Sequence, residues 1–535
     1  MIISNDEWSA VDGAGSVGSE TTGTESYVNV ASGNEEKPLS LQVTPSNESV
    51  GLRADQKKTR IAATIKACEL AEDGSTRAPV DIVVAMDKSG SMCGEKINGC
   101  KRTMELMVRH LGSNDRLGLV SFACETKLEF PPMFMTKENK EEALRKIKTI
   151  RAGGGTNLSG GLATAGLELA RMDVPNTVRC IFLLTDGHPN GGISDPDVLV
   201  GMVRGLNRTE EDFNPGEAGR VLLHDAASES NAESADFYPK GLDPVIVNKP
   251  ISLFCFGYGS DHNSHTLKAM SEATPGGAYY FVEKDSNVAT AFGDAMGGVL
   301  SVVAQGVTLS ISVPPDAHAK GVHILKVHHK QATKRSDTCY TVNIGDFYAE
   351  EERDLLFEIE LASVEPCGTT PVVHVDVAVS FMDTIHKRPA SLGPVQCRIG
   401  RPDSPEVSPP NEHVEVQWLR IQTARAIEAA NDMAAANGDL DGARKLLKDA
   451  EKSITKSKVF AKGALPVMLE VLLVDLRELI SAFKSHDLYH TSGSHSAATV
   501  SLGYEKQRCV ESSASKSNGF RTRAKQNMSF GFTSQ

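Results

Sequence analysis

The stretch Val80-Asp-Ile-Val-Val-Ala-Met86-Asp87-Lys-Ser89-Gly-Ser91 decides the fold of the central part of the chain. Its first half is a short, nearly continuous apolar run, which is typical of a strand buried on both faces of a parallel sheet. Its second half places a carboxylate and two hydroxyls directly after that strand. Because ligands of open α/β sheets bind at the carboxyl ends of the strands, the stretch predicts both the fold and a site at its edge.

Strands and helices alternate after this stretch. We expect strands at 116–122, 126–130, 178–185, 251–257 and 278–282, and helices at about 94–111, 137–151, 157–172, 264–274 and 286–303. This alternation indicates an α/β fold with a doubly wound, mostly parallel sheet and right-handed crossovers. Residues 79–303 are therefore predicted to form one α/β domain.

Two segments near this domain lack an apolar pattern. Residues 1–37 are rich in Ser, Gly, Thr and Glu. They bury too little apolar surface to offset the entropy of ordering, so we predict that they are disordered. Residues 206–248 are acidic and rich in Ser and Asn, and the alternation resumes after them. We interpret 206–248 as a mobile acidic insertion.

Residues 305–400 change to a period of two, with apolar side chains at Val307, Leu309, Ile311 and Val313. Clusters of Pro, Gly and Asp separate such runs, which is typical of an all-β sandwich. Residues 38–75 contain two further short strand patterns. We expect them to join the same sandwich, so that the α/β domain is inserted between its two parts.

The C-terminal part of the chain is predicted to begin with a helical segment at 411–484. Asp439 stands where it can cap a helix, and an apolar stripe with helical spacing follows it. Residues 485–535 are rich in Ser and His and then basic. We predict that they form a flexible tail.

Three separated pieces of the sequence supply oxygen atoms to one edge of the predicted sheet. Asp87, Ser89 and Ser91 follow the first buried strand, Thr156 follows a run of three glycines, and Asp186 ends a second central strand. Hard divalent cations such as Mg²⁺ prefer oxygen ligands of these kinds. We therefore predict a site for Mg²⁺, with Mn²⁺ as an alternative, whose residual positive charge attracts a carboxylate.

These pieces resemble the D-x-S-x-S, T and D motif of the von Willebrand factor A family, in the order that the family has. The resemblance covers about residues 79–303. It implies a metal-ion-dependent adhesion site, in which Ser89, Ser91 and Thr156 contact the ion and Asp87 and Asp186 act partly through water. It also implies a protein partner that presents Asp or Glu.

The chain as a whole is similar to intracellular plant proteins that combine this domain with a RING-type zinc finger and act as ubiquitin ligases. The similarity includes Gly438-Asp-Leu-Asp-Gly-Ala-Arg444 and, more weakly, Ser4-Asn-Asp-Glu7 and Thr522-Arg-Ala-Lys525. A RING finger needs eight paired Cys and His ligands. The ten cysteines of this sequence are scattered without any C-x-x-C pair. Ligase activity is therefore not carried over from the resemblance.

The sequence also bears on other classes of function. A net charge of −13 argues against unspecific binding to nucleic acid or to an anionic membrane. We see no signal peptide and no apolar run of membrane-spanning length, so we expect a cytoplasmic protein, with the nucleus as an alternative. The chain has no G-x-S-x-G elbow, and Gly94–Gly99 continues as Cys100-Lys101, unlike a phosphate-binding loop, so we expect no enzymatic activity.

Several other side chains are assigned ordinary roles. Cys93 and Cys100 are interpreted as packing residues, and His188 as a loop residue. His486, His490 and His495 are interpreted as parts of a polar tail.

The function that we predict is metal-dependent binding of an acidic residue of a partner protein. Two alternatives stay open. The chain acts in ubiquitination as a substrate adaptor or a RING-less paralogue, or it is a structural scaffold whose metal site is idle. Assembly with itself or with a relative also stays open.

Overall fold

The computed structural model describes residues 37–70, 77–186, 188–206, 250–259, 262–274, 276–282, 285–362, 371–457, 459, 466–508, 520 and 522–533. The predicted disorder of residues 1–37 and the predicted mobility of residues 206–248 fall, apart from residues 37 and 206, outside this part of the chain. Among the helices of the described part, none is both long and apolar enough to cross a membrane.

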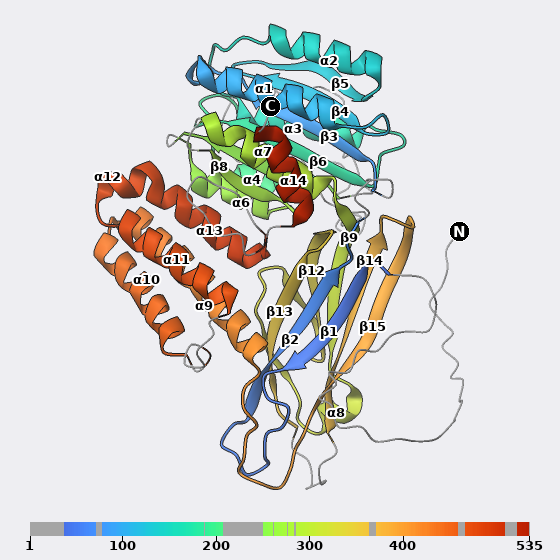
Figure 1. The fold of residues 1–535 in the computed structure, drawn as a ribbon, viewed down its shortest axis with the longest axis vertical. Helices are drawn as coiled ribbons and strands as arrows, with labels where there is room; N and C mark the ends of the chain where they lie inside the picture. The colour runs from blue at the N-terminus through green and yellow to red at the C-terminus, as the bar shows by residue number, and fades with distance from the viewer. Residues whose placement is uncertain are drawn as a thin grey trace, which may run out of the picture. The chain divides into compact units, whose positions relative to one another are not determined.

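An α/β domain with a doubly wound sheet forms the middle of the chain (Figure 1). In the described residues its sheet has six strands, all parallel except the edge strand β5. The strands β3, β6, β7 and β8 are buried along their whole length, as their apolar runs predict. In sheet order the strands are β5 (Thr126–Phe134), β4 (Arg116–Phe122), β3 (Val80–Asp87), β6 (Val178–Thr185), β7 (Ser252–Tyr258) and β8 (Ala278–Val282).

Helices cover both faces of this sheet, and alternate residues of β3 show which face each helix covers. Ile82 and Val84 share a core with the first group of helices, whereas Val83 and Ala85 share a core with the second group. The first group is α1 (Glu95–His110), α2 (Lys137–Thr149) and α7 (Asp285–Val299). The second is α3 (Leu158–Ala170), α4 (Pro196–Gly205) and α6 (Ser264–Glu272). Helix α7 ends four residues before the predicted boundary at 303, because the chain already enters the next strand at Val302.

The α/β domain is inserted in a β-sandwich. Of the two strands before the insertion, one pairs with a strand that follows it, and the other pairs with the first at the sheet edge. Side chains from both sheets share one core. The first sheet has the order β1 (Leu39–Pro45), β2 (Lys58–Ala67), β13 (Glu352–Glu360) and β10 (Ile324–Val327). The second has the order β11 (Ala332–Ser336), β12 (Cys339–Tyr348), β9 (Val302–Ser312), β14 (Val372–Asp383) and β15 (Arg388–Ile399), and a short helix, α8 (Pro315–Ala319), follows β9.

A helical segment follows the sandwich. It contains α9 (Glu412–Asn437), α10 (Leu440–Thr455) and α11 (Val467–Ala482), which share an apolar core. The predicted cap is present, since the carboxylate of Asp439 accepts a hydrogen bond from the backbone N–H of Gly442.

The flexible tail predicted at 485–535 is wrong for the described part of that range. This part forms α12 (His486–Leu488), the π-helical turn Tyr489–Gly493, α13 (Ser494–Lys506) and α14 (Arg523–Thr533). Residues 495–504 of α13 are all buried, because the helix packs against α9 on one side and against α6 and β8 on the other. A helix covered on all sides has no polar face, so the apolar stripe that marks a surface helix is missing from its sequence.

His495 corrects the interpretation of the histidines as a polar tail. Its ring is only 4% exposed, and it stacks on Phe281 with ring centroids 4.5 Å apart. His262 lies beside it at 4.6 Å. His495 is thus a core residue at the contact between α13 and the α/β domain.

Helix α14 docks on α7 through close backbone contact and a buried ion pair. A Cβ atom added at Gly293 or Gly297 of α7 would lie 2.5 or 2.7 Å from the Cα atom of Ser529 or Lys525, so only glycine permits this approach. The ammonium of Lys525 lies 2.9 Å from Oδ2 of Asp294, and both side chains are almost fully buried. The sequence of the helix pair therefore specifies its docking.

Replacing Lys525 by Met is expected to lower the free energy of unfolding by about 3–5 kcal/mol, because it leaves the buried carboxylate of Asp294 without its cation. Urea denaturation measures this loss. Arg523→Ala, which removes an exposed ion pair of the same helix, is the matched control and should cost less than about 1 kcal/mol. Adding Asp294→Asn to Lys525→Met should recover part of the loss. Equal losses in the two single variants would contradict the assigned role of the ion pair.

Candidate functional site

The site lies where the order of strands in the α/β sheet reverses. After β3 the chain builds β4 and β5 on one side, and then crosses to place β6, β7 and β8 on the other. Strands β3 and β6 are parallel neighbours, with Met86 beside Leu184, so Asp87 and Asp186 leave the sheet at the same edge. Open α/β sheets bind ligands at such a point.

The loop after β3 folds around the carboxylate of Asp87. Its Oδ1 accepts a hydrogen bond from the backbone N–H of Ser89 at 2.8 Å, and its Oδ2 accepts one from the hydroxyl of Thr185 at 2.7 Å. The hydroxyls of Ser89 and Ser91 lie 3.1 Å apart. Ser91 then donates to Oδ1 of Asp186 at 2.8 Å. Four of the five predicted residues thus form one connected group.

The glycine loop brings Thr156 to the same place. Gly154 has a φ of 90° and lies against Cys124, which a side chain at this position would not tolerate easily. Its carbonyl accepts the N–H of Gly90 at 2.9 Å, which joins this loop to the serine loop. The backbone N–H of Thr156 donates to Oδ1 of Asn190 at 2.7 Å, and Asn190 returns a backbone hydrogen bond at 3.1 Å.

Burial gives the site its electrostatic character. Asp87, Ser89, Thr156 and Asp186 are at most 3% exposed, whereas Ser91 is exposed. Burial raises the pKa of the Asp87 carboxyl and the charge of Asp186 raises it further, while hydrogen bonds from Ser89 and Thr185 lower it. Two carboxylates this close, beside three hydroxyls, form an oxygen donor set that could hold a hard divalent cation.

Three residues of the site were not found from the sequence. Lys96 of α1 forms an ion pair with Oδ2 of Asp186. Thr185 donates a hydrogen bond to the carboxylate of Asp87, and Asn190 accepts one from the backbone of Thr156. Thr185 directly precedes Asp186, so strand pairing could have predicted its contact with Asp87. Lys96 and Asn190 depend on loop geometry that no spacing rule supplies.

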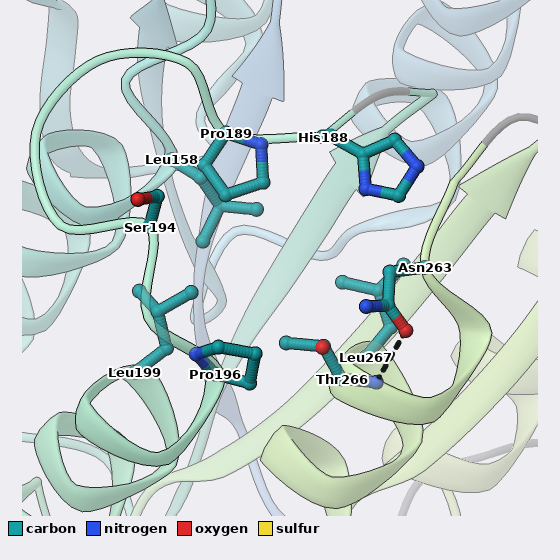
Figure 2. A pocket seen from close by; sticks show the side chains of 9 residues that line it. All are labelled: Leu158, His188, Pro189, Ser194, Pro196, Leu199, Asn263, Thr266 and Leu267. Carbon is teal, nitrogen blue, oxygen red and sulfur yellow. Dashed lines mark hydrogen bonds between the residues drawn. The ribbon is translucent and has the colours of Figure 1, made fainter. Parts of the chain in front are cut away.

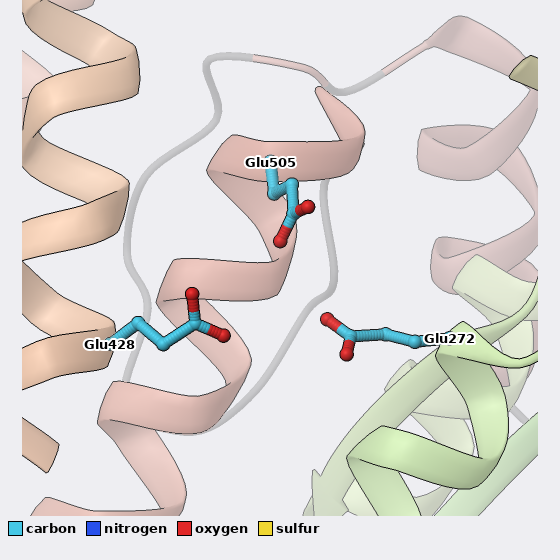
Figure 3. A group of neighbouring side chains, drawn as sticks. All are labelled: Glu272, Glu428 and Glu505. Atoms are coloured by element: carbon cyan, nitrogen blue, oxygen red, sulfur yellow. The ribbon is translucent and has the colours of Figure 1, made fainter. Parts of the chain in front are cut away.

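A second group of acidic side chains lies at the contact of three helices. Glu272 of α6, Glu428 of α9 and Glu505 of α13 have carboxylate oxygens within 4.8 Å of one another (Figure 3). The ammonium of Lys330 lies 3.4, 2.8 and 2.8 Å from them, and Lys268 lies 3.2 Å from Glu428. Two ammonium groups thus lie among three carboxylates, so the group is an ion-pair cluster that ties the helical segment, the sandwich and the α/β domain together.

Comparisons with known proteins show what the α/β domain is similar to. Residues 81–294 match the family model of the von Willebrand factor type A domain. The chain is 27% identical over 292 residues to the E3 ubiquitin-protein ligase WAV3 of Arabidopsis thaliana. That match spans 54% of this chain and 32% of WAV3. This chain is also 26% identical over 255 residues to the inter alpha-trypsin inhibitor heavy chain 4 of Mus musculus. That match spans 46% of this chain and 22% of the relative.

Two solved structures share the fold over most of the chain. A von Willebrand factor type A protein from Catenulispora acidiphila superposes with a TM-score of 0.56 at 17% identity, and the match covers 84% of this chain and 91% of that one. The ArnB paralog VWA2 from Sulfolobus acidocaldarius gives a TM-score of 0.51 at 14% identity, with 87% and 98% covered.

Proposed function

We propose that this chain, whose residues 81–294 form a von Willebrand factor type A domain, binds a partner protein through a divalent cation at the site of Asp87, Ser89, Ser91, Thr156 and Asp186. The family commonly mediates metal-dependent protein interactions. The observation that carries the proposal is the convergence of these oxygen-bearing side chains at the reversal of the sheet, with both carboxylates buried. Mg²⁺ is the cation that such donors prefer, and Mn²⁺ is its closest substitute.

The charge of the site explains why the partner would be acidic. The carboxylates of Asp87 and Asp186 balance the two charges of the cation, and the ammonium of Lys96 adds one further positive charge. The loaded site is therefore cationic and attracts an anion. A carboxylate of Asp or Glu can fill an open position of the metal while it neutralises this charge.

The first test is calorimetric titration of Mg²⁺ and Mn²⁺ into the wild-type protein and Asp186→Ala. We expect saturable binding in the wild type that is weakened at least tenfold in the variant, because the variant loses one of the two anionic groups of the site. Asp197→Ala, at an exposed position at the start of α4, is the control and should bind as the wild type does. Absence of binding in all three proteins would favour the scaffold with an idle metal site.

The second test uses Lys96→Met. This substitution should have opposite effects on the binding of the cation and on the later binding of a carboxylate to the loaded site. Removal of the tethered cation should strengthen Mg²⁺ binding by about three- to tenfold, since less positive charge opposes the ion. It should also weaken the binding of acetate, a minimal carboxylate probe, to the loaded site by a similar factor. Calorimetry measures the first step, and the effect of acetate on Mn²⁺ relaxivity measures the second.

Lys101→Met on the same helix, whose ammonium bonds the carbonyl of Ile150, is the control for this test and should change neither step. A variant at Lys96 that loses affinity in both steps would show that the residue only supports the fold. That result would contradict its electrostatic role.

A role in ubiquitination is the second candidate, and the similarity to WAV3 favours it. In this role the chain would be a substrate adaptor or a RING-less paralogue that joins a true ligase. An autoubiquitination assay on the purified chain with E1 and E2 enzymes is expected to be blank, and WAV3 serves as the positive control. Robust activity of the chain alone would overturn the proposal that it is not an enzyme.

We also propose that the protein acts inside the cell. Cys180, Cys255 and Cys397 are free thiols, which is the state that the cytosol maintains. Burial raises the pKa of the Cys180, Cys255 and Cys397 thiols, so these three are packing residues without thiolate reactivity.

A further inference from the structure

A pocket opens beside the site of Asp87 and Asp186 (Figure 2). Its apolar wall comes from the start of α3, the loop after β6, and the helices α4 and α6. The residues of this wall are Leu158, Pro189, Pro196, Leu199 and Leu267. Two chain segments connect the pocket to the site directly, since Leu158 follows Thr156 by two residues and the loop of Pro189 begins at Asp186. A partner bound at the site therefore lies within reach of the pocket.

Hydrogen bonds fix each segment of the pocket in place. The side chain of Asn263 caps α6 by accepting the N–H of Thr266 at 3.1 Å, and Asp195 caps α4 by accepting the N–H of Val198 at 3.0 Å. The hydroxyl of Ser159 accepts the N–H of Ile193 at 2.9 Å, which anchors the loop between β6 and α4 to α3. The pocket is thus formed before any partner arrives, so binding costs little ordering entropy.

Four polar residues also line the pocket, His188, Ser194, Asn263 and Thr266, and the side chains of the last two turn toward its middle. The hydroxyl oxygen of Thr266 is buried without a hydrogen-bond partner, and the residue is 6% exposed. Figure 2 shows its side chain turned into the pocket. The amide nitrogen of Asn263 also points toward the middle, because the amide oxygen is held by the cap. A buried hydroxyl without a partner is costly, and a ligand that offers it a hydrogen bond removes this cost.

The pocket has a volume of about 100 Å³. Because one water needs about 10–15 Å³ of such space, it takes a group of roughly seven to ten non-hydrogen atoms. That size suits one aromatic side chain. The oxygen of a phenol can accept a hydrogen bond from Asn263 and can share one with Thr266, while its ring lies against prolines and leucines.

We propose that this pocket binds a tyrosine side chain of the partner segment whose acidic residue binds the cation. The inference rests on the proposed function, because the acidic residue of the same partner segment is held by the proposed cation. The pocket itself contains no residue of the metal site. A smaller aliphatic side chain would leave the hydroxyl of Thr266 unpartnered. A phenylalanine would fill the space without satisfying either polar group.

The first arm of the test needs no cation. Ligand-observed NMR compares p-cresol, which carries the tyrosine ring and hydroxyl, with toluene, which lacks the hydroxyl. We expect p-cresol to bind about three- to tenfold more tightly than toluene, the value of one hydrogen bond to a buried group. Thr266→Val, which keeps the shape and removes the hydroxyl, should abolish this preference.

The matched control is Thr499→Val, which changes another buried threonine whose hydroxyl has no partner but which does not line the pocket. It should keep the preference for p-cresol. If toluene binds as tightly as p-cresol, or if neither binds, a tyrosine pocket is ruled out.

The second arm separates the pocket from the metal site. A library of acetylated peptides with one fixed Asp and randomised flanking positions is captured on the immobilised protein in Mg²⁺ and eluted with EDTA. Enrichment of Tyr by the wild type but not by Thr266→Val is the expected result. Capture without enrichment of Tyr would overturn the pocket and leave the metal-dependent function standing. Binding of p-cresol without capture of any peptide would leave the pocket standing and contradict the metal-dependent function.

Discussion

The structure depends on one constraint, which is the placement of two carboxylates at the ends of adjacent parallel strands. Strand β3 delivers Asp87 and strand β6 delivers Asp186, and the pairing of these strands fixes the distance between them. Two buried negative charges at one edge repel each other and lose solvation. Hydrogen bonds that Ser89, Ser91 and Thr185 donate to the two carboxylates offset part of this unfavourable energy. The glycine loop and the helix of Lys96 then close around the same group.

Buried charge also organises the rest of the described chain. Glu351 of the sandwich receives the guanidinium groups of Arg353 and Arg508, and Arg508 donates in addition to the carbonyl of Gly276 in the α/β domain. The half-exposed Lys330 adds a further ion-pair cluster, in which it joins three carboxylates from three helices. Such pairs add little net stability compared with apolar packing, but a shifted arrangement would leave a charge unpaired. They therefore specify how the inserted domain, the sandwich and the C-terminal helices fit together.

Much of this could be predicted from the sequence, because a strand buried on both faces leaves a continuous apolar run. The runs at β3, β6 and β7 predicted the sheet, and the motif of Asp87, Ser89 and Ser91 predicted side chains that the fold brings together at one edge. The helices after residue 485 could not be predicted in the same way, since α13 is buried on all sides and shows no apolar stripe. Lys96 and Asn190 were missed for a different reason. Their roles arise from contacts between segments that are far apart in sequence, and the spacing of residues along one chain carries no signal for such contacts.

The proposed metal site and the pocket beside it share the same chain segments. Asn190 holds the backbone of Thr156, the helix that begins after Thr156 supplies a wall of the pocket, and Ser159 of that helix anchors the loop that returns from Asp186. A shift of this helix would therefore change the cation ligands and the pocket together. Because hydrogen bonds hold these segments, the two proposed anchors lie at a set distance from each other. The proposed partner would then be recognised by the spacing of two side chains, which a cation site alone could not achieve.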